Sequence, residues 1–208
     1  MGFIKNQSFC IKLLFTVCGL MYVQGQFPKP KYTFLNSKVL VEPDVYAMHW
    51  NYTKIQVIVQ LQVKTNGWLG FGLTKSGGMN GADVMIAWVD SNGKVNFTDR
   101  HIVDRNIIVD FEQNWFLVEG SKANGYTSIV FRRDLQTCDS KDEDIDIEEG
   151  TPRVIFAWNN NLPTGDISYH GAKTRGIATV GLISTLNQPV VFTAQDNIKT
   201  YDFKVNVS

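Results

Sequence analysis

Three histidines, His49, His101 and His170, are the only imidazole side chains in the 208-residue chain, and they lie far apart in the sequence. No His-His, His-x-His or Cys-x-x-Cys pair is present, although such pairs let a short segment bind a transition metal. A Gly-x-Ser-x-Gly nucleophile elbow is also missing from the sequence. The sequence therefore predicts no complete catalytic site within this chain, and leaves open whether the histidines converge in space.

Residues 139–149 form an acidic segment with seven carboxylates and one lysine. Asp142, Asp144 and Asp146 match the opening of a calcium-binding EF-hand loop. Ile147 replaces the glycine that such a loop needs for its sharp turn, and Arg153 replaces its last, bidentate acid. We therefore expect a solvated acidic loop that binds no cation.

The N-terminus has the features of a secretory signal peptide. Lys5 and Lys12 precede a short apolar run over residues 13–23, and small residues follow, so we predict cleavage after Gly25. The run is shorter than the roughly 20 apolar residues of a membrane-spanning helix. The mature chain, with 18 basic and 20 acidic side chains, is expected in the secretory pathway (ER, Golgi or vesicles) or outside the cell, with no nucleic-acid partner.

Secretion makes four residues candidates for covalent modification. Asn51, Asn96 and Asn206 each begin an Asn-x-Ser/Thr sequon and are predicted glycosylation sites on the surface. Cys138 is the single cysteine left after removal of residues 1–25, which is unusual in an oxidising compartment. It is either a buried free thiol or the partner of a cysteine elsewhere.

The elements that must position any site are β-strands. Apolar residues alternate with glutamines from Ile55 to Val63, which predicts a long strand with one buried face; Ile58, on the outer face, predicts partial cover there. Residues 90–93, Asp-Ser-Asn-Gly, predict a hairpin turn. Residues 26–31, with two prolines, predict an extended leader. Other β-rich runs are 34–41, 68–73, 84–89, 95–97, 115–118, 128–131, 154–158, 179–183, 190–192 and 201–207. Many short strands favour an all-β antiparallel sandwich or barrel.

Five ordered sequence blocks resemble a known domain family. The first runs from Gly67 to Leu73 and continues from Gly77 through Asp90 to His101; the others are 111–115, 132–139, 154–158 and 169–176. They resemble the DOMON domain that precedes the copper domains of dopamine β-hydroxylase and its monooxygenase-like relatives. The resemblance implies an immunoglobulin-like β-sandwich over residues 32–185. Residues 186–208 resemble a linker and the first strand of the family's copper-binding core.

The resemblance also implies a function. The chain would be the N-terminal, non-catalytic module of a secreted, copper-dependent monooxygenase acting on a small substrate such as a phenethylamine. The copper ligands of the family lie outside this chain, so whether the chain belongs to an enzyme stays open. Implied partners are the C-terminal copper domains and a second copy in a homodimer. Cys138 would bond to a cysteine in a distant segment beyond the copper core.

A cation site inside the sandwich is implied as well. The matching ligands are the Asp83 carboxylate, the backbone carbonyls of Val84 and Arg100, and the side chain of Asn114. Oxygen ligands suit Ca²⁺ or Na⁺ rather than copper. Asn114 stands where the family has an acid, so affinity should be lower. The alternative is that Asp83 and Asp99 only accept hydrogen bonds from turn amides.

Two rival functions come from other DOMON proteins. Some bind heme and carry electrons, which would need axial ligands such as Met79 with His170; Met48 and Met85 are further candidates. Others bind sugars, which would use Trp68, Trp88 or Trp158 as stacking surfaces. Tryptophans among alternating apolar residues are usually core residues, which ranks sugar binding last.

Overall fold

The computed structural model describes residues 27–139, 141, 144–148 and 153–183. These residues form eleven strands and no helix, so no described segment is a helix that could cross a membrane. The predicted signal peptide, the residues assigned to the copper core, and Asn206 lie outside the described residues.

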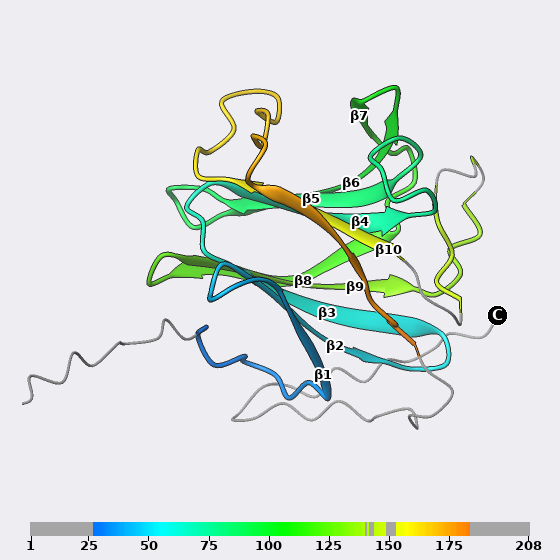
Figure 1. Ribbon diagram of the computed structural model, residues 1–208, viewed down its shortest axis with the longest axis horizontal. Helices are drawn as coiled ribbons and strands as arrows, with labels where there is room; N and C mark the ends of the chain where they lie inside the picture. Colours follow the sequence, from blue (N-terminus) through cyan, green and yellow to red (C-terminus); the bar gives the residue numbers. More distant parts are fainter. Residues whose placement is uncertain (1–26, 140, 142–143, 149–152, 184–208) are drawn as a thin grey trace, which may run out of the picture.

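The strands form two antiparallel sheets stacked as a sandwich (Figure 1). The five-stranded sheet has the order β1-β2-β3-β9-β8, and the six-stranded sheet the order β11-β10-β4-β5-β6-β7. Their bounds are β1 Asn36–Val41, β2 Tyr46–Tyr52, β3 Gln56–Val63, β4 Trp68–Thr74, β5 Asp83–Val89, β6 Val95–Val103, β7 Asn106–Val109, β8 Trp115–Ala123, β9 Tyr126–Asp134, β10 Arg153–Asn159 and β11 Arg175–Thr179. The predicted all-β antiparallel sandwich is confirmed.

Apolar side chains at alternating positions of the strands fill the space between the sheets. Leu69, Phe71 and Leu73 of β4 point inward and are almost completely buried, as are Met85 of β5 and Phe131 of β9. Each such side chain contributes roughly 1.5–3 kcal/mol when it leaves water. The intervening residues of β4 and β5 therefore lie on the outer face of the six-stranded sheet.

The outer face of β3 is covered more fully than the partial cover predicted from Ile58. Gln60 and Gln62 are 3% and 2% exposed, because the leader covers this face of the sheet. Gln62 donates to the carbonyl oxygen of Pro28 (2.7 Å), and Gln60 donates to Ser128 Oγ (2.8 Å). Both side-chain amide nitrogens thus find acceptors, while Gln60 Oε1 has no hydrogen-bond partner among the described residues.

Strand positions agree with the sequence pattern in the hydrophobic centre and differ at the edges. The hairpin at residues 90–93 is confirmed: Asp90 Oδ1 accepts hydrogen bonds from the amides of Asn92 and Lys94. The strand predicted at residues 179–183 is shifted, since β11 ends at Thr179; those predicted at 190–192 and 201–207 lie outside the described residues. The sequence pattern missed β2 and β7.

Candidate functional site

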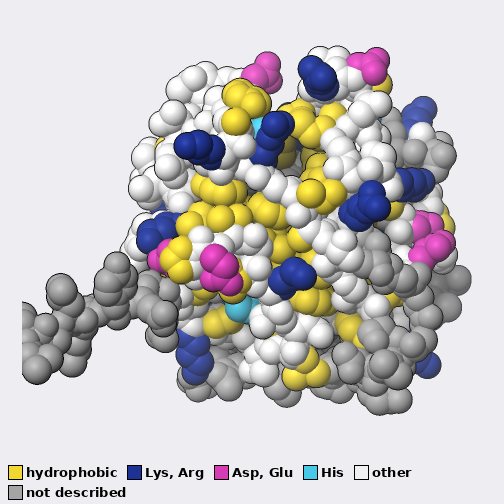
Figure 2. Space-filling model, viewed as in Figure 1, with side chains coloured by type: hydrophobic (Ala, Val, Ile, Leu, Met, Phe, Trp, Pro, Cys, Tyr) yellow, Lys and Arg dark blue, Asp and Glu magenta, His cyan; other side chains and the backbone are white. Residues whose placement is uncertain are grey.

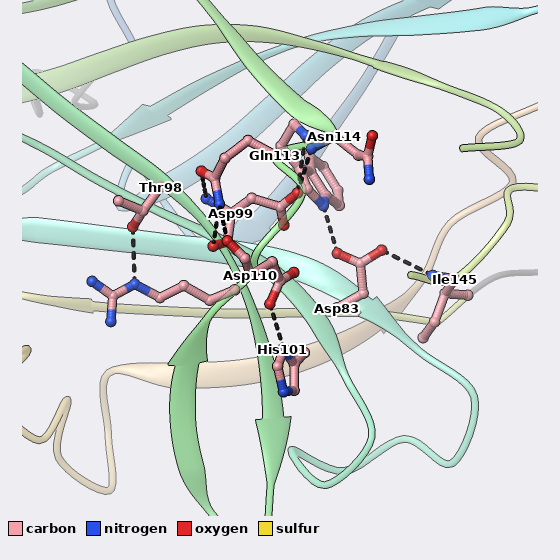
Figure 3. Close-up of polar contacts among 10 residues, drawn as sticks. Asp83, Thr98, Asp99, His101, Asp110, Gln113, Asn114 and Ile145 are labelled. Atoms are coloured by element: carbon pink, nitrogen blue, oxygen red, sulfur yellow. Dashed lines mark hydrogen bonds and ion pairs between the residues drawn. The ribbon is translucent and has the colours of Figure 1, made fainter. Parts of the chain in front are cut away.

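The site with the most charge is a buried acidic cluster between the sheets (Figure 3). Asp83 begins β5, and Asp99 lies in the middle of the neighbouring strand β6. Asp83 pairs with His101 and Met85 pairs with Asp99, so the two aspartates are diagonal neighbours on one face of the sheet. Neither side chain is exposed to solvent.

The Asp83 carboxylate is held by three donors. Trp115 Nε1 donates to Oδ1 (2.5 Å), while Arg133 Nη2 (2.7 Å) and the amide of Ile145 (3.0 Å) donate to Oδ2. Arg133 is itself fully buried and stands over the Trp115 ring. Asp83 is therefore fixed in position by β8, by β9 and by the acidic segment.

Asp99 is held on one side only. Its Oδ2 accepts hydrogen bonds from the amides of Asn114 (2.6 Å) and Trp115 (3.2 Å) at the start of β8. Its Oδ1 is buried and has no hydrogen-bond partner among the described residues. A buried, unpaired carboxylate oxygen is costly unless a cation or a water coordinates it.

Asp144 completes the cluster from the acidic segment. Its side chain is only 4% exposed, and neither carboxylate oxygen has a hydrogen-bond partner within the described part of the chain, although Arg133 Nη2 lies 3.6 Å away. The solvated loop predicted here is wrong for Asp144, because Ile145 and Ile147 pack into the core and carry Asp144 inside, whereas Asp146 is exposed as predicted. Oxygens of Asp83, Asp99 and Asp144 lie within 4.8 Å of one another.

Electrostatics in this cluster disfavour three ionised carboxylates. Burial raises the pKa of Asp99 to about 8 and the pKa of Asp83 to about 6, and it also raises the pKa of Asp144. When ionised, the three carry three negative charges against one positive charge on Arg133. A bound divalent cation would balance the remaining two.

The implied ligands Val84, Arg100 and Asn114 are arranged around this cluster. Val84 and Arg100 face each other across β5 and β6. Asn114 binds Asp99 through its backbone, and its buried side-chain Nδ2 has no partner. Because amide oxygen and nitrogen exchange places on a 180° flip, this side chain can present an oxygen ligand.

A second ring of polar groups supports the cluster. His101 Nδ1 contacts Asp110 Oδ1, and the amide of Asp110 donates to the Asp99 carbonyl (3.1 Å). Gln113 Oε1 accepts from the Asp99 amide, and Gln113 Nε2 donates to the carbonyl oxygens of Asp99 and Asp110. These contacts tie the strand carrying Asp99 to the segment that precedes β8.

A separate apolar cavity of about 340 Å³ lies on the outer face of the six-stranded sheet. Figure 2 shows hydrophobic side chains gathered over this part of the molecule. Both heme-ligand candidates, Met79 and His170, line it, and they come from the β4–β5 and β10–β11 connections. Met48 and Met85 are completely buried in the core between the sheets, so neither reaches the cavity.

The tryptophans proposed as sugar-stacking surfaces are distributed differently. Trp158 packs in the core between the sheets, and Trp68 lines the cavity with its Nε1 donating to Ser168 Oγ (3.2 Å). Trp88 pairs with Trp68 and is half-buried. The three rings therefore form no common platform.

The predicted modification sites differ in accessibility. The surface position predicted for Asn51 is wrong: its side chain is 1% exposed, its Nδ2 donates to the Thr33 carbonyl (2.9 Å) and its Oδ1 accepts from the Leu35 amide. Asn96 is half-buried, and its side chain meets only the Lys94 carbonyl (3.5 Å). Cys138 is an exposed free thiol rather than a buried one.

Comparison with known proteins places the chain in a family. The sequence model for the DOMON domain matches residues 42–159. MOXD1 homolog 2 of Drosophila melanogaster is 33% identical over 58% of this chain and 16% of that protein; DBH-like monooxygenase protein 1 of Gallus gallus is 32% identical over 67% and 22%. The matched segment thus spans about a fifth of these relatives.

The fold also resembles solved structures. The cytochrome domain of Myriococcum thermophilum cellobiose dehydrogenase superposes with a TM-score of 0.53 at 16% identity, over 66% of this chain and 75% of that one. The cytochrome b domain of pyranose dehydrogenase from Coprinopsis cinerea gives 0.51 at 17% identity, over 69% and 86%. The sequence match and the shared sandwich lead to one conclusion: this chain belongs to the DOMON domain family.

Proposed function

We propose that this chain is a non-catalytic DOMON module of a DBH-like, copper-dependent monooxygenase in the secretory pathway, and that its acidic cluster binds Ca²⁺ as a structural ion. The observation that carries the cation is the group of unpaired, buried carboxylate oxygens on Asp99 and Asp144 beside Asp83. Ca²⁺ takes oxygen ligands in flexible geometry, which suits carboxylates from two strands and a loop. The net charge of the ionised cluster favours Ca²⁺ over Na⁺.

The bound ion would join parts of the chain that are distant in sequence. Asp83 and Asp99 belong to the six-stranded sheet, and Asp144 belongs to the segment that follows β9. Without a cation, Arg133 is the one positive charge among the described residues that offsets the carboxylates, and it makes its closest ion pair with Asp83. The cation would therefore keep the acidic segment, and with it exposed Cys138, in a fixed position for the proposed disulfide to a segment beyond the copper core.

Thermal unfolding of the secreted chain tests this proposal. The chelator-treated chain at pH 8 is titrated with Ca²⁺, with Na⁺ in a parallel series. Ca²⁺ at a hundredfold excess over its dissociation constant should add about 2.7 kcal/mol to the free energy of unfolding. If neither Ca²⁺ nor Na⁺ changes the unfolding midpoint, the structural cation is excluded. The transcript beyond Ser208 should encode paired histidines and a His-x-His motif; their absence would exclude the monooxygenase module.

A second candidate function is heme binding in the outer cavity. It is favoured by one observation: the cavity brings together Met79 and His170, which are 91 residues apart in the sequence. His170 Nδ1 donates to the Gly171 carbonyl (2.7 Å), so Nε2 carries the lone pair that a metal requires. A heme iron held there would supply one-electron transfer.

Absorption spectroscopy tests this second function independently of the cation. Addition of hemin to the secreted chain should give a sharpened Soret band, and His170→Ala should remove that spectral change. His49→Ala, which removes an imidazole of the other sheet outside the cavity, is the matched control and should leave the spectrum unchanged. Identical spectra of wild type and His170→Ala would refute axial ligation by His170.

A further inference from the structure

The floor of the outer cavity is a row of four residues across the sheet. Gly70 of β4 pairs with Ile86 of β5 on one side and with Ala157 of β10 on the other, and Ala157 pairs with Arg175 of β11. All four line the cavity. The two smallest side chains of the row therefore lie side by side in its centre, which gives the cavity a flat floor.

Packing within the protein does not require glycine at position 70. A Cβ added to Gly70 would meet nothing closer than 3.5 Å, which is an ordinary contact distance. The other glycines of these strands differ: a Cβ at Gly72 would lie 2.2 Å from the Asp83 carbonyl, and a Cβ at Gly176 would lie 2.3 Å from the Phe156 ring. The space above Gly70 thus belongs to the cavity and not to the core.

An imidazole on the cavity wall is an independent indication of a ligand. His170 is nine-tenths buried and lines the cavity, and its Nδ1 is bonded to the Gly171 carbonyl. Its Nε2 makes no hydrogen bond with the described part of the chain. The lone pair of this nitrogen is therefore available to a ligand that enters the cavity.

The chemistry of the cavity rim defines one end of the ligand. Arg175 is the only charged residue among the described residues that line the cavity, and its side chain is exposed at the edge strand β11. It forms no ion pair with a described acidic residue. A guanidinium in this position is suited to bidentate binding of a carboxylate.

We propose that Gly70 and Ala157 form the floor for a flat, apolar ligand, and that Arg175 binds a carboxylate of this ligand at the β11 edge. Heme is a flat, apolar ligand with carboxylate groups, so the inference deepens the second candidate function and rests on it. Gly70 sets the thickness that the cavity admits, and Arg175 sets the orientation.

The test compares hemin with its dimethyl ester, which keeps the ring and lacks the free carboxylates. Wild type should bind hemin about tenfold more tightly than the ester, because the ester has no free carboxylate to pair with the exposed Arg175. Arg175→Gln should weaken the binding of hemin about tenfold and leave the affinity for the ester unchanged. Arg105→Gln, which removes an exposed arginine of the β6–β7 turn outside the cavity, is the control and should bind both compounds as wild type does.

Substitutions at Gly70 test the floor. Gly70→Val should weaken the binding of hemin and of its ester to the same extent, by about tenfold or more, because added methyl groups in a fitted site cause overpacking. Gly70→Ala, which the protein's own packing admits, should have a smaller effect on both. Gly181→Val, where an added Cβ meets nothing within 4 Å, is the control and should bind both ligands as wild type does. Unfolding midpoints close to that of wild type establish that the variants are folded.

Two results would overturn the inference while leaving heme binding intact. The first is that Gly70→Val binds hemin with the affinity of wild type. The second is that Arg175→Gln loses affinity for hemin and for the ester to the same extent. If the folded wild type binds neither compound, the second candidate function fails, and the inference fails with it.

Discussion

Asp99→Asn removes one buried charge from the acidic cluster while keeping the shape of the side chain. The asparagine Oδ1 can still accept from the amides of Asn114 and Trp115, as Asp99 Oδ2 does. Its amide nitrogen would replace the unpaired Oδ1 and face the carboxylates of Asp83 and Asp144. We expect the variant to fold and to lose only the charge on which the cation depends.

The magnitude follows from the pKa of Asp99, which burial raises from 3.8 to about 8. Between these two values the folded chain binds more protons at this site than the unfolded chain, so cation-free stability falls as pH rises. Each pKa unit corresponds to about 1.4 kcal/mol, so a shift of about four units sets an upper limit on the order of 5 kcal/mol. Relaxation of the protein around the charge makes the real cost smaller. We expect ionised Asp99 to lower the free energy of unfolding by about 3 kcal/mol, or the unfolding midpoint by about 6–12 °C.

The assay is thermal unfolding of wild type and Asp99→Asn at pH 5 and pH 8, with chelator or with Ca²⁺. In chelator, wild type should lose about 6–12 °C between pH 5 and pH 8, and the variant should lose markedly less. At pH 8, Ca²⁺ should stabilise wild type and leave the variant almost unchanged. Asp104→Asn, at the exposed β6–β7 turn, is the matched control and should behave as wild type. Equal Ca²⁺ responses of wild type and Asp99→Asn would refute the reasoning.

Three further predictions concern the same region and the sequons. Arg133→Met should destabilise the chelated chain by about 3–5 kcal/mol in denaturant unfolding, because Asp83 loses its buried partner, and Ca²⁺ should restore part of the loss. Asn114→Asp should tighten Ca²⁺ binding several-fold in calorimetry and lower stability in chelator; unchanged affinity would place Asn114 outside the site. Glycopeptide mass spectrometry of the secreted chain should find a glycan at Asn96 and none at Asn51, because the Asn51 side chain is buried.

Local sequence patterns were sufficient to predict the sandwich. Alternation in β4 and β5, together with the turn at residues 90–93, defines adjacent antiparallel strands without tertiary information. The burial of Gln60 and Gln62 could not be predicted, because it depends on a leader that is distant in the sequence. Asn51 was misplaced for a similar reason: its burial comes from hydrogen bonds to residues 33 and 35.

The acidic cluster was predicted only in part. The sequence predicts Asp83 as a cation ligand, and Asp83 lies in the cluster; it identifies Asp99 only as an acceptor for turn amides, and Asp99 does accept two amides with one oxygen. Asp144 had been assigned to solvent because its neighbours are acidic. The signal that could have corrected this is the alternation of Ile145 and Ile147 with acids, which is the pattern of a half-buried segment.

Terbium luminescence is the most direct measurement of the central claim that the cluster binds a cation. Trp115 donates its indole N–H to Asp83, so its ring lies within energy-transfer reach of an ion bound between Asp83 and Asp99. With indole excitation, Tb³⁺ emission should rise to saturation at one ion per chain, fall when Ca²⁺ is added, and be lost in Asp99→Asn. Emission that is absent in wild type, or that Ca²⁺ does not displace, would contradict the claim.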